Sequence, residues 1–113
     1  MTVFVGVLKA VLHVPGARSL KDSRQVVMSL RDRVRHRFDV SCHEVDPSDH
    51  PTRRALVVTT AGNDARLIRS ILDRVREQIT QQANAIPLSI DVDVAPWDPR
   101  SQPDPVPDDG DEG

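Results

Sequence analysis

Residues 2–24 of the chain, TVFVGVLKAVLHVPGARSLKDSR, join an apolar run to a Pro-Gly turn and then to the start of a helix. The run from Thr2 to His13 is rich in Val, Leu and Phe, and it predicts a β-strand that ends at the turn. Both of its alternating faces are largely apolar, which is typical of a strand in the middle of a sheet. Ser19 is the expected N-cap of the helix, and Asp22 occupies the capping-box position that usually holds Glu or Gln.

The segments that follow predict a second helix and three further strands. The first helix is expected to run to about Arg37, and the second over residues 64–82 with Leu67 on its core-facing side. The further strands are expected at residues 39–46, 53–61 and 88–95. In the last of them the alternation places Leu88 inward. The βαββαβ order predicts a ferredoxin-like α+β sandwich, in which a four-stranded antiparallel sheet has its first and third strands in the middle and both helices on one face.

Length and charge divide the chain into one domain and a tail. We expect residues 1–96 to form the ferredoxin-like domain, because 113 residues leave no room for a second core. Residues 97–113 are proline-rich and acidic, and we expect them to be disordered. Cys42 is the only cysteine, so no internal disulfide can form, as is usual in the reducing cytoplasm. Without a signal-peptide pattern or an apolar run long enough to cross a membrane, the sequence predicts a cytoplasmic protein with no membrane association.

The first helix carries an excess of positive charge. Residues 18–37 hold seven Lys and Arg residues against two acids, whereas a solvated helix usually mixes the two signs more evenly. The cations expected on one side, together with the turn before the helix, form what we call the basic row: Arg18, Lys21, Arg24, Arg31 and Arg35. Such a row predicts contacts with the phosphate backbone of RNA or of a ribosomal particle, with His13 and Lys9 as secondary contacts. The alternative is a solvated helix surface whose arginine stems cover the edge of the core.

The face of the sheet away from the helices, called the open face here, is expected to expose apolar residues. From the first strand it would show Val5, Val7, Lys9, Val11 and His13. An exposed apolar face indicates a protein partner, a second copy of the chain or a covering tail. An interaction or dimerisation module that uses this face is therefore the alternative function. The acidic tail could also fold back on the basic helix or serve only as a solubilising end.

Nothing in the sequence predicts catalysis or a cofactor. Cys42 and His43 are the nearest approach to a nucleophile with its base, but strand alternation points them to opposite faces. The four histidines lack the close spacing of a zinc site. Base stacking of the RNA-recognition-motif type is disfavoured, since Phe4 is the only aromatic residue of the predicted central strands and is expected to face the helices. We therefore expect a protein that is not an enzyme and holds neither a metal nor a cofactor.

The segments Val5–Leu8, Leu12–Arg24, Arg37–Ser41 and Glu44–Asp46 resemble the YlxP-like family of small bacterial proteins of unknown function. The resemblance covers about residues 3–95 and rests chiefly on the His-Val-Pro-Gly…Ser-Leu-Lys segment. It implies a ferredoxin-like fold and an association with translation, because genes of this family tend to lie beside those for initiation and ribosome-maturation factors. It implies no catalytic residue. Ser23 departs from the family pattern, which prefers Lys there, and the acidic tail lies outside the family domain.

Overall fold

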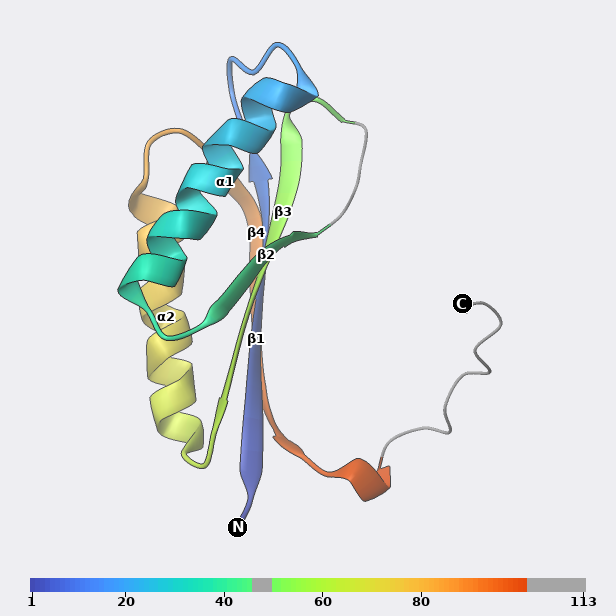
Figure 1. Cartoon of the computed structure of the whole chain (residues 1–113), viewed down its shortest axis with the longest axis vertical. Coiled ribbons are helices and arrows are strands. Elements are labelled where there is room, and N and C mark those ends of the chain that lie inside the picture. The colour runs from blue at the N-terminus through green and yellow to red at the C-terminus, as the bar shows by residue number, and fades with distance from the viewer. Residues whose placement is uncertain (46–49, 102–113) are drawn as a thin grey trace, which may run out of the picture.

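The computed structural model describes residues 1–45 and 50–101 of the chain. Its elements, in order, are β1 (Val3–His13), α1 (Leu20–Arg37), β2 (Ser41–Val45), β3 (Arg53–Gly62), α2 (Ala65–Gln81), β4 (Ile86–Trp97) and the short 3-10 helix η1 (Pro99–Ser101). The described strands form one antiparallel sheet in the order β2-β3-β1-β4, and both helices cover the same face of it (Figure 1). The predicted ferredoxin-like α+β fold is confirmed. Residues 46–49, which include the last residue of the predicted strand 39–46, and the predicted tail from residue 102 onward lie outside the described residues.

The turn between β1 and α1 forms as its residues predict. Gly16 has a φ of 79°, in the left-handed region that glycine enters without steric cost. The Ser19 hydroxyl accepts a hydrogen bond from the Asp22 backbone N–H at 3.2 Å, which makes Ser19 the N-cap. The Asp22 carboxylate accepts from the Arg18 backbone N–H at 3.1 Å, one residue before the N-cap. The capping box is therefore present in a modified form, with its acid bonded to the residue preceding the cap.

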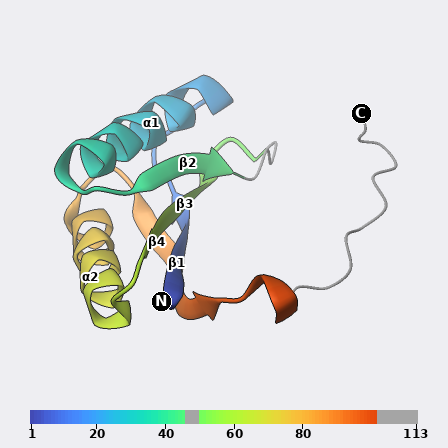
Figure 2. The same ribbon diagram turned by 60° about the horizontal axis from the view of Figure 1, so that its bottom comes forward.

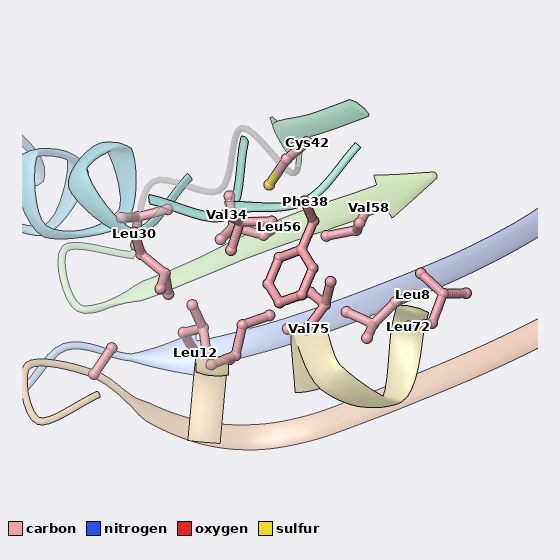
Figure 3. Close-up of a cluster of buried hydrophobic side chains, with 14 of the residues drawn as sticks. Leu8, Leu12, Leu30, Val34, Phe38, Cys42, Leu56, Val58, Leu72 and Val75 are labelled. Carbon is pink, nitrogen blue, oxygen red and sulfur yellow. The ribbon is translucent and has the colours of Figure 1, made fainter. Parts of the chain in front are cut away.

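Alternation along β1 separates the core from the open face. Leu8, Ala10 and Leu12 are fully buried under the helices, whereas Val7 and Lys9 are exposed on the other side. Figure 3 shows the Phe38 ring in the middle of this core, among side chains from both helices and three strands. Phe38 directly follows α1 and acts as its C-cap, so the end of the helix is tied to the centre of the core.

At Gly6 the helix α2 approaches the sheet closely. A Cβ atom built on Gly6 would lie 2.5 Å from Ile68 Cγ2 and 2.8 Å from Leu72 Cδ1. At Gly62, on the neighbouring strand, the nearest atom to such a Cβ is Ile68 Cδ1 at 3.8 Å, an ordinary van der Waals contact. The absence of a side chain at Gly6 thus lets α2 pack directly on β1.

Two residues expected in the core lie outside it. The register of β1 and β4 shifts between Val11, which is opposite Ser89, and Leu12, which is opposite Pro87. Leu88 is the extra residue of this β-bulge and is 53% exposed, so its predicted inward orientation was wrong. Leu67, in the first turn of α2, is 58% exposed because the helix meets the sheet through its neighbour Ile68.

The last strand is longer than predicted. It runs from Ile86 to Trp97, two residues beyond the predicted strand at each end. With these additional residues β4 pairs along the full length of β1, so that Ile86 is opposite His13 and Trp97 is opposite Val3. Pro96 is accommodated because β4 lies at the edge of the sheet, where a missing N–H donor leaves no neighbouring strand unpaired.

Candidate nucleic-acid interface

The basic row follows the side of α1 that overlooks the edge strand β2. Figure 2 shows α1 running beside β2. Two contacts fix this orientation: Arg24 approaches Glu44, and Arg35 bonds to the backbone of Cys42. At 1.5 Å per residue, the helical part of the row from Lys21 to Arg35 extends over about 21 Å. The structure therefore brings the predicted helix cations together along one edge of the molecule.

Arg35 is held against the edge strand by two contacts. Its Nε donates to the Cys42 carbonyl oxygen at 2.8 Å, and its Nη2 lies 3.2 Å from His43 Nδ1. A guanidinium has five N–H donors in a fixed fork, so donors remain for a further acceptor. Because these contacts limit the rotation of the side chain, Arg35 would meet a phosphate with little additional loss of conformational freedom.

Arg24 shares an acidic partner with a buried arginine that the sequence did not single out. Its Nε lies 3.8 Å from Glu44 Oε1, and its side chain is 59% exposed. Glu44 Oε2 accepts a hydrogen bond from Nε of Arg54, which is almost fully buried under α1. Since Glu44 already compensates Arg54, the positive charge of Arg24 is only partly neutralised.

The other three members of the row differ in how far they are neutralised. Arg31 bonds to Asp32 Oδ1 through Nε at 3.0 Å and Nη2 at 2.9 Å, and its side chain is only 23% exposed. Arg18 and Lys21 are exposed, and neither side chain has an ion pair within the described part of the chain. The N-terminal end of the row consequently offers its least compensated charges.

The positive charge also extends to residues that the sequence reasoning left out. Arg37 Nη1 donates to Gln78 Oε1 of α2 at 3.1 Å, and the Arg37 and Arg74 guanidinium groups lie 5.3 Å and 5.5 Å from the centroid of the Phe38 ring. Residues 18–37 have a net charge of +5, from seven cations against two acids. Residues 64–81 add four arginines against three acids, a net charge of +1. The charge count of residues 18–37 already included Arg37, whereas the position of Arg74 beside the Phe38 ring depends on how the two helices pack.

Lys9 and His13 do not join the basic row. Lys9 is opposite Val57 and His13 is opposite Arg53 on β3, and all four residues belong to the open face. The sheet therefore lies between these two side chains and the helices that carry the row. Of the seven predicted contact residues, the structure brings five together and places two on the other side.

The described residues contain no arrangement that indicates catalysis. Cys42 is buried and His43 is exposed, as expected from their alternation on β2. Burial raises the pKa of the Cys42 thiol to about 11, and the nearby Arg35 only partly opposes this rise. Within residues 1–45 and 50–101, no three His, Cys, Asp or Glu side chains gather to hold a metal ion. Neither helix of the described chain is long and apolar enough to cross a membrane.

The fold and this surface define a small ferredoxin-like α+β domain with a positively charged helix layer. Comparison with known proteins then gives its family. The model described as "Protein of unknown function (DUF503)" matches residues 5–92, so the chain belongs to this family. No curated protein matches the chain.

Proposed function

We propose that this protein is a non-enzymatic RNA-binding factor of the cytoplasm, and that the basic row on its first helix contacts the phosphate backbone of RNA or of a ribosomal particle. The observation that carries the proposal is the net charge of +5 of residues 18–37, together with the exposure of Arg18, Lys21 and Arg24. The matched segment also carries the resemblance to YlxP-like proteins, and membership of that group is part of the proposal. An association with translation would agree with the positive charge and with the YlxP-like resemblance.

The contacts would depend on charge and would carry little sequence preference. Arg18 and Lys21 supply exposed charges at the start of α1, while Arg24 and Arg35 supply guanidinium forks positioned by β2. Arg31 contributes less, because its charge is largely satisfied by Asp32. Contacts of this kind position a nucleic acid and release its counterions, so affinity should fall steeply as the salt concentration rises.

The experiment measures binding to ribosomal subunits by co-sedimentation, and to a single-stranded RNA by fluorescence anisotropy, each over a range of salt concentrations. The test variant is Lys21→Glu with Arg24→Glu, and it is expected to weaken binding and flatten the salt dependence. The matched control is Arg66→Glu with Arg69→Glu, which makes the same charge change at exposed positions of α2. Because Arg24 also borders Glu44, Arg18→Gln with Lys21→Gln provides a second variant away from that contact. Equal binding by the test variants and the control would refute the proposal.

A further inference from the structure

The open face changes in character along its length. The half nearest the start of β1 is mostly apolar, with Val3, Val5, Val7, Ala61, Ala95 and Trp97, and it borders Thr59 and Asp93, which lie opposite Val7. The other half carries the cations and histidines of this face: Lys9, His13, His43 and Arg53. Val3, Val7 and Trp97 are 37%, 36% and 50% exposed, so the described residues cover these side chains only in part.

The described chain ends beside the apolar half. Trp97, at the end of β4, is opposite Val3, and η1 begins two residues later. In both views η1 lies on the side of the sheet away from the two helices (Figures 1 and 2). A hollow at this end of the molecule is lined by Val3, Trp97 and Pro99 among other residues. The last described residue, Ser101, therefore lies on the side of the sheet that carries the open face.

We propose that residues 102–113 of the chain, QPDPVPDDGDEG, dock along the open face with their acidic end over its cationic half. Along their lengths, the segment and the open face both change from mostly apolar to charged residues. Between residues 103 and 107 the segment has three prolines and a valine, which match the valines and Trp97, together with one acid, Asp104. It continues with four acids between residues 108 and 112, which match Lys9, His13 and Arg53.

The lengths of the segment and of the face agree. At 3.3 Å per residue in a strand, Lys9 lies about 20 Å from Val3 and His13 lies about 33 Å from it. At 3.1 Å per residue in the extended conformation that prolines favour, Asp108 can reach about 22 Å from Ser101 and Glu112 about 34 Å. The acids thus arrive level with the cations when the segment runs parallel to β1.

Charge also determines which part of the face the segment would cover. Residues 102–113 contain five acids and no Lys or Arg. Asp91 and Asp93 on β4 are opposite Lys9 and Val7, and they would repel these acids from the β4 side. The favourable path therefore runs over β1 and β3, where Lys9 and Arg53 lie. Because the segment is tethered to the face, weak contacts are sufficient to hold it there.

The test uses the full chain with a spin label at the acidic end. Cys42 is buried and its thiol has a raised pKa, so a nitroxide maleimide will react with a cysteine introduced by Gly110→Cys and spare Cys42. Broadening of backbone amide NMR signals then maps the label. We expect the signals of Lys9, Val11 and Arg53 to lose most of their intensity at low salt and to recover at about 0.5 M salt, where screening is strong.

Two variants of the labelled chain distinguish this docking from other occupants. Lys9→Glu with Arg53→Glu is expected to restore the signal of Val11, whereas the matched change Arg66→Glu with Arg69→Glu on α2 should leave the broadening as it was. Broadening of the α1 signals in place of those of β1, or of neither, would overturn the proposal. Broadening that appears only between a labelled molecule and a second, isotope-labelled molecule would also overturn it, in favour of a dimer through the open face.

Discussion

Adding one methyl group at Gly6 tests the packing of α2 on the sheet. The Cβ atom of Gly6→Ala would lie 2.5 Å from Ile68 Cγ2, whereas unstrained carbon atoms lie about 3.5–4.0 Å apart. The helix or the strand must therefore move by about 1 Å, because Leu72 Cδ1 closes the other side at 2.8 Å. Forcing an extra methyl group into a packed core costs about 1–3 kcal/mol.

Part of that cost is offset in the unfolded chain. Replacing glycine by alanine reduces the conformational entropy of the unfolded state, which stabilises the fold by about 0.4–1 kcal/mol. We therefore expect Gly6→Ala to lower the free energy of unfolding by about 1–2 kcal/mol. For a domain of this size, that loss lowers the Tm by roughly 5–15 °C.

Gly62→Ala is the matched control, since its Cβ atom would lie 3.8 Å from Ile68 Cδ1, an ordinary van der Waals distance. Urea denaturation followed by circular dichroism should find this variant as stable as the original chain or up to about 1 kcal/mol more stable. Ile68→Leu removes the methyl branch at Cβ, so combining it with Gly6→Ala should recover at least about 0.5 kcal/mol relative to the sum of the single changes. Equal stability of Gly6→Ala and Gly62→Ala would refute the reasoning.

Three further predictions concern a buried thiol, a buried ion pair and the two sides of the sheet. The folded state holds the Cys42 proton more tightly than the unfolded state, because burial raises the pKa of the thiol to about 11. The free energy of unfolding should therefore be insensitive to this group below pH 9 and should fall by up to about 3 kcal/mol between pH 9 and about pH 11. Urea denaturation should show this fall in the original chain and not in Cys42→Ala. Glu44→Ala leaves Arg54 buried without its partner and should lower the free energy of unfolding by about 3 kcal/mol in the same assay. Glu44→Leu with Arg54→Leu should recover most of this stability, and an equal loss in both variants would contradict the role of the ion pair. Lys9→Glu should leave RNA binding by anisotropy unchanged, because Lys9 lies on the open face; a loss as large as that of Lys21→Glu with Arg24→Glu would contradict the assignment of binding to the helix layer.

The fold could be predicted because its main signals are local. Alternation along β1, the Ser19 cap and the apolar sides of the two helices each follow from neighbouring residues, and together they specify the order of elements. The bulge at Leu88 could not be predicted, since an extra residue in a strand is defined by its partner strand and not by its own pattern. The sequence pattern therefore predicts the correct topology but the wrong orientation for the Leu88 side chain.

The candidate interface was predictable only in part, for a related reason. The charge count identified the first helix, and the periodicity identified the side of it that carries Arg24 and Arg35. Which cations remain available depends on partners distant in the sequence: Glu44 for Arg24 and the Cys42 carbonyl for Arg35. The burial of Arg54 was invisible from the sequence, because an arginine at the start of a strand is normally exposed.

The contact between Arg35 and the Cys42 carbonyl has a consequence for self-assembly in crowded solution. A four-stranded sheet has two outer strands, and unpaired backbone groups on such strands invite another chain to add to the sheet and begin a fibre. On β2 the Arg35 guanidinium occupies a backbone acceptor, and the strand is only five residues long. On β4 the prolines at positions 87 and 96 remove donors, and the irregularity at Leu88 interrupts a continuous template. Both edge strands of the sheet thus discourage the addition of further strands, even though β4 is twelve residues long.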